Sequence, residues 1–389
     1  RELGVAAGER VGIALAPGCD FAIALHACFA AGALAVPFDP REPRERWPLA
    51  GVAAVVDRPL ACAGPATARR APAPQRPAVL VRTSGSSGTP KEIPLTFANF
   101  AWSALGSAVA LGLDPRERWL CALPLVHVGG ISILMRAWLT GTTAVIHERF
   151  ETRAVLDALT HGGITAVSLV PTTLARLLDA GLAAPPALRV ALLGGAPIAP
   201  ALVERARAAG VPVSKTYGLT ETCSQVATQI PGAKGDGAPP LFCTRVTIAN
   251  DGEILVAGPT LSPVCGPLLA TGDLGEIASD GSLRVIGRKA DTIITGGENV
   301  APAAVEAVLC AHPAIVEAAV FGVADGEWGE AVCAAVVVRA PVAQSDLREH
   351  CAAGLARHQV PKRFVVVESL PRTASGKLRR GDLASIAGL

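Results

Sequence analysis

Short apolar runs alternate with longer apolar stretches along the first half of the chain. The runs 11–15, 34–38 and 190–193 have the length and aliphatic content of buried strands, whereas 97–111 and 172–180 have the length of helices. Strands and helices that follow one another in this way favour a sheet with helices packed against it. We therefore predict a layered α/β body for this part of the chain.

The pattern changes in the second half. Strands expected at 245–248, 253–256 and 283–286 alternate with Asp-Gly turns, which indicates hairpins and a β-rich subdomain. The remainder shows the pattern of a compact α+β module of about 100 residues. We predict a large N-terminal domain over residues 1–287 and a small C-terminal domain over residues 288–389.

Composition narrows the class of protein. The chain has 389 residues, which is long enough for two domains. Its net charge of +2 and its 4% of aromatic residues provide no basic, aromatic-rich surface, so nucleic acid is not an expected partner. The ten cysteines form no C-x-x-C pair. We therefore expect reduced thiols in a cytoplasmic protein and neither a disulfide framework nor a zinc site.

The most apolar stretch, residues 21–36, is shorter than the ~20 residues that a membrane helix needs. It also contains His26, so we predict a buried helix that enters a strand, and no membrane span. The chain begins with Arg1 and not with Met, which leaves open a natively short N-terminus and a trimmed one. Self-association into a homo-oligomer is left open as well, because the sequence carries no signal for it.

A loop rich in Ser, Thr and Gly follows the apolar run 78–81. Glycines let backbone N–H groups approach a phosphate closely, hydroxyls add donors, and a lysine adds a positive charge. The spacing differs from that of the P-loop, which ends its glycine-rich turn on Lys-Ser/Thr. Taken alone, such a segment is roughly twice as often a solvated connector as a phosphate site. The candidate residues are Thr83, Ser84, Gly85, Ser86, Ser87, Gly88, Thr89 and Lys91.

Five further motifs carry groups that suit a nucleotide, and two of them lie in the α/β body. LPLVHVGG places His127 between a strand end and a turn of small residues, although a lone histidine of this kind is more often structural. YGLTET places Tyr217, two threonines and Glu221 after a strand, where open α/β sheets bind ligands. A carboxylate such as Glu221 also suits Mg²⁺.

The other three motifs lie further along the chain. ATGDLG contains Asp273, which could accept hydrogen bonds from ribose hydroxyls, and GRKADTIITGGENV contains Arg288, which could hold ribose or phosphate. PRTASGK contains Lys377 on a Ser-Gly loop. Each motif is weak alone, because a TGD is often a turn and a terminal lysine is usually solvated. Their number and order, behind the hydroxyl-rich loop, predict a site for a nucleoside triphosphate.

These motifs resemble, in the same order, those of adenylate-forming enzymes of the acyl-CoA synthetase superfamily, from residue 11 to about residue 383. Within it, LPLVHVGGISILMRAWL, SLVPTTLARLL, LLGGAPI and YGLTETCSQV are most similar to the o-succinylbenzoate–CoA ligases of menaquinone biosynthesis. The resemblance implies an acid–thiol ligase that uses ATP, Mg²⁺ and CoA. Such an enzyme joins a carboxylate to AMP with release of pyrophosphate, and then transfers the acyl group to CoA.

The resemblance also implies roles for individual residues. The loop from Thr83 to Lys91 would bind the β- and γ-phosphates. Lys377 would contact the α-phosphate and the reacting carboxylate. The residues implied in catalysis are Lys377, Thr220, Glu221 and His127, with Glu221 on Mg²⁺. The nucleotide-binding residues implied outside the hydroxyl-rich loop are Gly195, Tyr217, Gly218, Asp273 and Arg288.

The C-terminal domain of such enzymes rotates between the two half-reactions. A hinge is therefore expected near Lys289, Ala290 and Asp291, and many relatives carry Asp or Lys at the position of Ala290. The stretch between residues 237 and 271 is also shorter than usual in the superfamily.

Arg136 is an unusual charge within an apolar helix. A buried arginine needs an anionic partner, because an unpaired buried charge is costly. One hypothesis is that Arg136 faces the acid pocket and holds a second carboxylate of the substrate. The alternative, equally weighted, is an arginine at a helix end that reaches solvent or a structural Asp. Other residues expected to line the acid pocket are Ser168, Thr172, Leu219 and Ser224.

Two other functions remain open at this point. The protein could load an aryl or acyl group onto a carrier protein, which dependence of AMP release on CoA would distinguish. It could also be a catalytically silent nucleotide-binding relative. The joint presence of Lys91, Glu221, Asp273, Arg288 and Lys377 argues against the second alternative.

Overall fold

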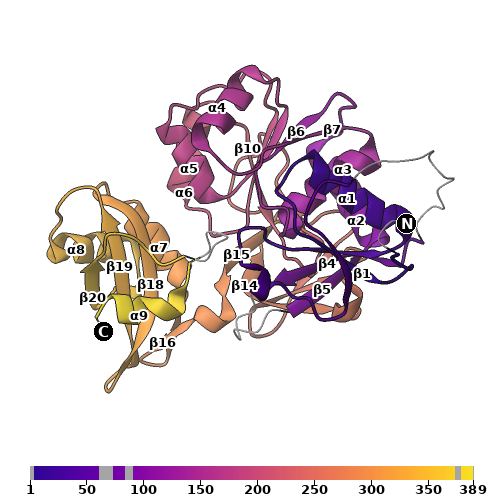
Figure 1. The fold of residues 1–389 in the computed structure, drawn as a ribbon. Coiled ribbons are helices and arrows are strands. Elements are labelled where there is room, and N and C mark those ends of the chain that lie inside the picture. Colours follow the sequence, from indigo (N-terminus) through magenta and orange to yellow (C-terminus); the bar gives the residue numbers. More distant parts are fainter. Residues whose placement is uncertain (1–3, 61–72, 84–90, 373–377, 389) are drawn as a thin grey trace. The chain divides into compact units, whose positions relative to one another are not determined.

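The structure, a computed structural model, describes residues 4–60, 73–83, 91–372 and 378–388, and its ribbon is shown in Figure 1. The chain divides into two compact units. Unit 1 comprises Arg1–Gly195, Ala209–Val246 and Val256–Leu269, and unit 2 comprises Ala196–Ala208, Thr247–Leu255 and Ala270–Leu389. The second unit thus includes the predicted small domain and some segments before it. The predicted boundary after residue 287 stays a prediction.

Unit 1 contains a five-stranded sheet with the strand order β3-β1-β2-β4-β5. Helix α1 (Cys19–Ala31) connects the parallel strands β1 and β2, as predicted from the apolar stretch at 21–36. Strand β5 pairs antiparallel with β4 at the edge of the sheet, and we did not predict it. Strand β5 contains Pro94, and a proline argues against a strand when only the sequence is considered, although an edge strand tolerates it. The strands are β1 (Arg10–Ile13), β2 (Leu34–Pro37), β3 (Val52–Val56), β4 (Pro77–Thr83) and β5 (Lys91–Thr96).

A second, six-stranded sheet has the order β11-β10-β9-β8-β6-β7 and is parallel except for the pair β10 and β11. Its strands are β6 (Arg118–Cys121), β7 (Thr143–Ile146), β8 (Ala166–Leu169), β9 (Val190–Leu193), β10 (Val213–Tyr217) and β11 (Ala227–Thr228). The strand before the YGLTET motif, expected from the sequence at 211–213, lies further along the chain, at 213–217. It includes the polar residues Lys215 and Thr216, whose side chains contact Asp236 at 3.3 Å and Thr228 at 2.8 Å, both outside β10.

Helix α2 (Phe97–Leu111) has the bounds that the sequence predicted. The Asn99 N–H donates to Thr96 Oγ1 at 3.1 Å and the Thr96 N–H donates to Asn99 Oδ1 at 2.9 Å. This reciprocal cap satisfies backbone donors that a helix start otherwise leaves unpaired. The other helices of unit 1 are α3 (Val128–Thr140), α4 (Thr152–His161) and α5 (Pro171–Asp179).

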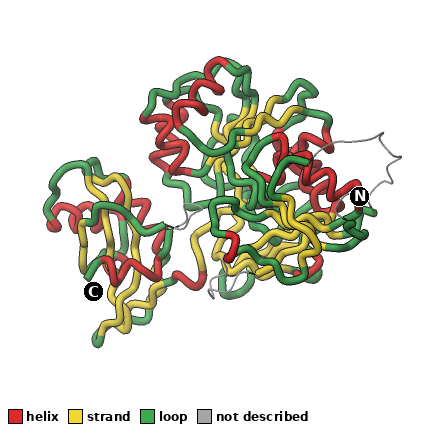
Figure 2. Tube along the Cα trace, viewed as in Figure 1, coloured by secondary structure: helices red, strands yellow, loops and turns green. Residues whose placement is uncertain are grey.

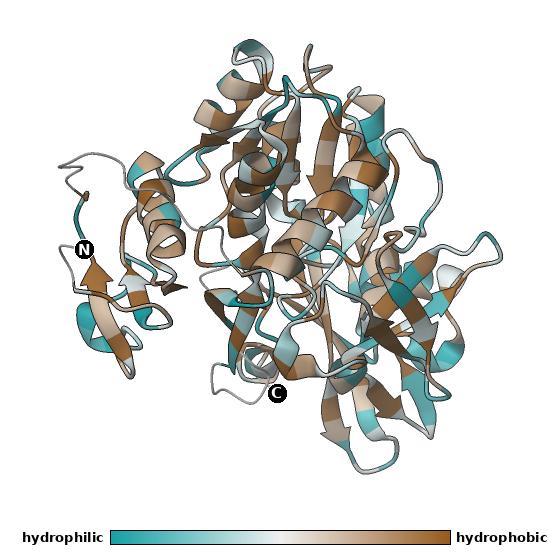
Figure 3. Cartoon of the chain, turned by 90° about the vertical axis from the view of Figure 1, so that its right-hand side faces the viewer, coloured by the Kyte–Doolittle hydropathy of each residue, from teal (hydrophilic) through white to brown (hydrophobic). Residues whose placement is uncertain are grey.

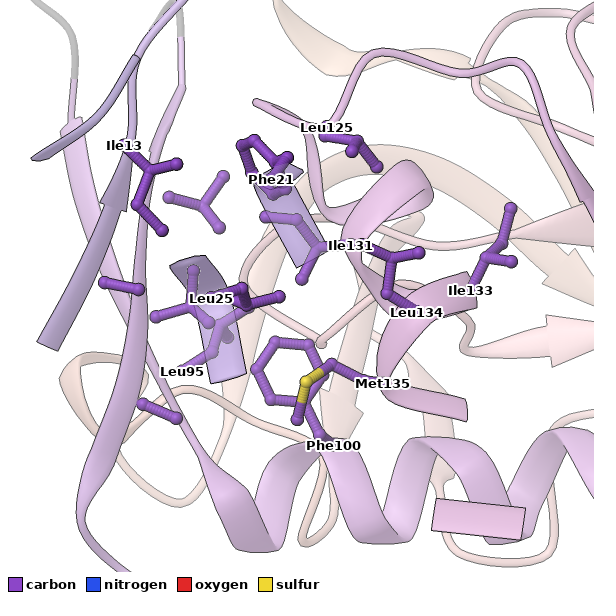
Figure 4. Close-up of a cluster of buried hydrophobic side chains, with 14 of the residues drawn as sticks. Ile13, Phe21, Leu25, Leu95, Phe100, Leu125, Ile131, Ile133, Leu134 and Met135 are labelled. Carbon is purple, nitrogen blue, oxygen red and sulfur yellow. The ribbon is translucent and has the colours of Figure 1, made fainter. Parts of the chain in front are cut away.

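One core cluster of unit 1 joins its first sheet, the helices α1, α2 and α3, and buried residues of the second sheet such as Trp119 and Val190. Phe100 of α2 and Met135 of α3 are each 1% exposed, and they pack in one cluster with side chains of the sheet and of α1 (Figure 4). Colouring by hydropathy shows many apolar residues along the strands and helices and polar residues in many loops (Figure 3). Burial of this apolar surface is the main stabilising contribution to the layered body.

A four-stranded sheet with the order β12-β13-β14-β15 comes next along the chain, as the Asp-Gly turns predicted. Its strands are β12 (Arg245–Ile248), β13 (Glu253–Ala257), β14 (Leu269–Ile277) and β15 (Leu283–Arg288). Strand β14 was not predicted, because ATGDLG has the composition of a turn. Gly272 has a φ of +73° inside this strand, a conformation that glycine adopts without strain.

The C-terminal part of unit 2 is the predicted α+β module (Figure 2). Its sheet has the order β17-β16-β19-β18, with β20 beside β19. Helices α7 and α8 cover one face, and the C-terminal segment with α9 covers the other. The strands are β16 (Ile293–Thr295), β17 (Glu298–Val300), β18 (Ile315–Asp325), β19 (Gly329–Val338) and β20 (Arg363–Val366). The helices of unit 2 are α6 (Pro200–Ala208), α7 (Pro302–Cys310), α8 (Gln344–Gly354) and α9 (Leu383–Ile386).

Within the described ranges, no helix combines the length and apolar content required to cross a bilayer. Nine cysteines lie in these ranges and all are free thiols, while Cys62 lies outside them.

The core contacts predict the effect of truncating Phe100. Phe100→Ala removes a side chain that is 1% exposed and should lower the free energy of unfolding by about 3–5 kcal/mol. Trp102→Ala on the same helix is the matched control, because Trp102 is 40% exposed and its loss should cost much less. Denaturant unfolding followed by circular dichroism measures both. Equal destabilisation by the two changes would contradict this account of the core.

Candidate functional site

The loop between β10 and β11 carries the YGLTET motif and folds back on itself. The Thr222 side chain is fully buried at 0% exposure, and its Oγ1 accepts from the Leu219 N–H at 3.0 Å. The Ser224 N–H donates to the Leu219 carbonyl at 3.1 Å. These bonds close the loop and present Thr220 and Glu221, both half-buried, at its tip.

The shape of this loop depends on Gly218. A Cβ at this position would lie 1.5 Å from the Ser224 carbonyl oxygen, so the backbones of the two residues approach too closely for any side chain. Cys223 and Ser224 have φ angles of +53° and +93°, which non-glycine residues rarely adopt. Such strained backbone persists only where its surroundings hold it, and it clusters at functional sites.

Two contacts hold the loop from outside. The Ser103 hydroxyl of α2 donates to the Cys223 carbonyl at 2.7 Å, and the Ser262 N–H donates to the Glu221 carbonyl at 2.8 Å. Within the described ranges, the Glu221 carboxylate makes no hydrogen bond or ion pair, so its oxygens suit a hard cation such as Mg²⁺.

The hydroxyl-rich loop joins two neighbouring strands. Thr83 ends β4, Lys91 begins β5, and the two are opposite each other in the antiparallel register. Lys91 is exposed and Thr83 is half-buried. The other candidates in this loop lie outside the described residues: Ser84, Gly85, Ser86, Ser87, Gly88 and Thr89. Lys377 lies outside them as well.

Asp273 and Arg288 are brought together by the sheet. They are opposite each other on β14 and β15, and Arg288 Nε forms an ion pair with Asp273 Oδ1 at 2.9 Å. The register shifts between Leu274 and Gly275 on the way to this pair. Asp273 is 6% exposed, whereas Arg288 is exposed.

Arg136 of α3 is 6% exposed, so the alternative in which it reaches solvent was wrong. Its guanidinium lies 4.3 Å from the centre of the Trp119 ring, and its Nη2 donates to Gln225 Oε1 at 3.0 Å. Burial lowers the pKa of Arg136 to about 10, so the side chain is still charged at neutral pH.

Two other predicted pocket residues lie near this arginine. The Trp119 indole N–H donates to Ser168 Oγ at 3.0 Å, and Ser132, one turn before Arg136 on α3, lies 3.5 Å from Ser224 Oγ. Sequence reasoning missed Trp119 and Gln225. Gln225 lies three residues after the end of the YGLTET motif, but nothing in its position marked it as a partner of Arg136.

The remaining predicted residues are placed as follows. Gly195 has a φ of +79°, and a Cβ added at this position would lie 3.5 Å from the Val170 side chain. Val170 precedes α5, whose second residue is Thr172. His127 is exposed and immediately precedes α3. The pKa of Asp39 is lowered mainly by the hydrogen bond from the Arg41 side chain, and His127 makes a smaller electrostatic contribution in the same direction. Leu219 and Tyr217 are half-buried in and beside the β10–β11 loop.

The expected hinge is flanked by ion pairs. Lys289 Nζ lies 2.6 Å from Asp251 and 2.9 Å from Glu253. Asp291 accepts from Arg380 Nε at 3.0 Å. Ala290, between the two charged residues, makes no side-chain contact of this kind.

The β10–β11 loop, with its carboxylate on a strained turn, follows a strand of an α/β sheet, which is where open sheets of this kind bind ligands. The sequence matches the AMP-binding enzyme family over residues 47–264 and the AMP-binding enzyme C-terminal domain over residues 304–377. The chain belongs to the AMP-binding enzyme family.

Curated relatives agree with this assignment. The chain is 40% identical over 331 residues to the 2-succinylbenzoate–CoA ligase of Bacillus subtilis, a match that covers 79% of this chain and 68% of that protein. It is 41% identical over 333 residues to the ligase of the same name from Bacillus licheniformis, with 79% and 69% covered.

Solved structures agree as well. The fold is similar to o-succinylbenzoate CoA synthetase from Bacillus subtilis in complex with the acyl-adenylate intermediate, with a TM-score of 0.89, 36% identity, and 97% of this chain and 88% of that chain covered. The same enzyme in complex with ATP and magnesium gives a TM-score of 0.88 at 36% identity, with 97% and 90% covered. The predicted superfamily and fold class are confirmed.

The strained turn predicts the effect of a methyl group at Gly218. Gly218→Ala forces the Ser224 carbonyl away and shifts Thr220 and Glu221, so adenylation should fall by about 100-fold. ATP–pyrophosphate exchange measures it. Gly326→Ala is the control, because an added Cβ there meets nothing within 4 Å. Unchanged exchange in Gly218→Ala would show that the turn does not position these residues.

Proposed function

We propose that this protein is an ATP-dependent acid–CoA ligase whose acid is o-succinylbenzoate. The observation that carries the proposal is the likeness, over 97% of the chain, to an enzyme whose solved complex contains the o-succinylbenzoyl adenylate. In this proposal ATP and CoA are co-substrates and Mg²⁺ is the cofactor. A cytoplasmic location, expected from the reduced cysteines, is part of the proposal.

The first half-reaction forms the acyl-adenylate. A carboxylate oxygen of the acid attacks the α-phosphorus of ATP, the bond from that phosphorus to the bridging oxygen breaks, and pyrophosphate leaves. Catalysis of such a displacement depends on positioning and on compensation of charge. Thr83 to Lys91 would hold the β- and γ-phosphates, Thr220 the α-phosphate, and Lys377 the charge that develops at the reacting carboxylate.

The nucleotide is held by other groups in this proposal. Tyr217 would lie against the adenine with Gly195 and Gly218 beside it, and Asp273 with Arg288 would hold the ribose. The ion pair with Arg288 at 2.9 Å holds the Asp273 carboxylate in place, and its two oxygens could accept hydrogen bonds from the ribose hydroxyls. Bound at Glu221, Mg²⁺ would neutralise phosphate charge.

The second half-reaction transfers the acyl group. The CoA sulfur attacks the acyl carbonyl, the bond from carbon to the AMP oxygen breaks, and AMP leaves. His127, which precedes α3, is included in the proposal as a catalytic residue. Arg136, Ser168, Thr172, Leu219 and Ser224 would line the acid pocket.

ATP–pyrophosphate exchange with a panel of aromatic and aliphatic acids tests the proposed function. Exchange should be fastest with o-succinylbenzoate and should fall by about 100-fold or more in Lys377→Ala, because this lysine compensates charge in the transition state. AMP release should require CoA and no added carrier protein. Faster exchange with another acid would replace the proposed substrate, and a need for a carrier protein would replace the acceptor.

A second experiment tests the hinge. Ala290→Pro fixes φ at this position and restricts Lys289, so it should block rotation while the ion pairs on either side remain. Pyrophosphate exchange should stay within about threefold of the unaltered protein, and CoA-ester formation from preformed acyl-adenylate should fall by about tenfold or more. Ala290→Gly is the control. Equal loss in both half-reactions would place the hinge elsewhere.

A further inference from the structure

Arg136 is a buried cation whose partners are all neutral. Its guanidinium stacks on Trp119 at 4.3 Å and donates to the amide oxygen of Gln225 at 3.0 Å. Its Nε is buried and has no hydrogen-bond partner among the described residues. No carboxylate in the described ranges forms an ion pair with it. A charge buried in this way is unfavourable unless something else compensates it.

Glu117 is the acid whose charge acts on Arg136, and it is already engaged. Its carboxylate accepts from Arg189 and from Thr165 Oγ1, the latter at 2.8 Å. Arg189 is thus the direct partner of Glu117. The protein itself therefore supplies no counter-ion in contact with the Arg136 guanidinium within the described residues.

The orientation of the Gln225 amide is fixed from its other side. Gln225 is 1% exposed and its Nε2 donates to Thr228 Oγ1 at 2.9 Å, which keeps Oε1 directed at Arg136. Thr228 is in turn bonded to Thr216 at 2.8 Å across β10 and β11. A glutamate of the same length at position 225 would place a negative charge in the same contact. The chain has a neutral amide there instead.

The hydroxyl groups around the arginine mark the same region as the predicted acid pocket. Ser168 is bonded to the indole on which Arg136 stacks, and Ser224 precedes Gln225. A ligand that reaches these hydroxyls with a second anionic group would meet an arginine that has donor capacity to spare.

We propose that Gln225 is a specificity-determining residue. It positions the Arg136 guanidinium through a neutral amide and so leaves its charge to be compensated by the second carboxylate of a dicarboxylic acid. This inference rests on the proposed function, because it assumes that the pocket activates an acid. It adds Gln225 as the residue that keeps the arginine available for that acid.

The test replaces Gln225 with Glu, which adds a carboxylate without changing the length of the side chain. Pyrophosphate exchange is measured with o-succinylbenzoate and with 4-oxo-4-phenylbutanoate, which has the same chain but one carboxylate. For Gln225→Glu, KM for o-succinylbenzoate should rise by about tenfold or more, while kcat and KM for the monocarboxylate should change by less than about threefold. Its thermal unfolding midpoint should not fall, because the new ion pair compensates Arg136.

Gln229→Glu is the matched control. Gln229 is also buried, at 2% exposed, but it bonds to the carbonyls of Gly235 and Gly237 and has no bond to Arg136. It should lower stability without changing the ratio of kcat/KM values for the two acids. Should Gln225→Glu fail to fold, Arg136→Met removes the positive charge that the added carboxylate would have compensated, and it should give the same loss of discrimination.

Each outcome decides the inference. An unchanged ratio in Gln225→Glu or in Arg136→Met overturns it, and so does equal exchange of both acids by the unaltered protein. Preference for a different dicarboxylic acid, lost in Gln225→Glu, supports the inference and overturns only o-succinylbenzoate as the substrate. No exchange with any acid overturns the proposed function, and the inference with it.

Discussion

The close approach of Gly218 to Ser224 is the constraint on which the central loop depends. Because no side chain fits between the two backbones, the chain turns back at once after β10 and places Thr220 and Glu221 at the tip. The left-handed conformations of Cys223 and Ser224 follow from the same turn. The hydrogen bonds from Ser103 and Ser262 then hold the strained segment. Helix α2 and the chain around Ser262 therefore both take part in shaping the loop.

Much of the fold could be predicted from the pattern of apolar residues. Helix α2 was predicted with its observed bounds because Thr96 supplies a cap and Gly112 follows the last turn. Strands β5 and β14 were missed for local reasons. Pro94 in one and Gly272 in the other have the composition of turns, and only pairing with a neighbouring strand overrides that preference.

The candidate site could be predicted in part. Residues with a motif around them, such as Glu221 and Asp273, could be selected as candidates from the sequence because their chemistry and spacing are local. Gln225 and Trp119 were not, because their importance lies in contact with Arg136 across 89 residues of chain in one case. Sequence reasoning identified Arg136 as a charge in need of a partner, but offered solvent or an Asp as the structural alternatives. The structure instead shows an indole face and an amide.

The Asp273–Arg288 pair has a consequence for how this hairpin can evolve. Successive side chains of a strand point to opposite faces, so a slip of one residue between β14 and β15 would send one member of the pair to the far side of the sheet. The pairing of Asp273 with Arg288 does not depend on which residues form the intervening turn. A gain or loss of one residue there would change the register unless a β-bulge compensated for it, and a register shift of this kind already occurs between Leu274 and Gly275. The length of this turn, more than the identity of its residues, therefore determines whether Asp273 and Arg288 stay opposite each other.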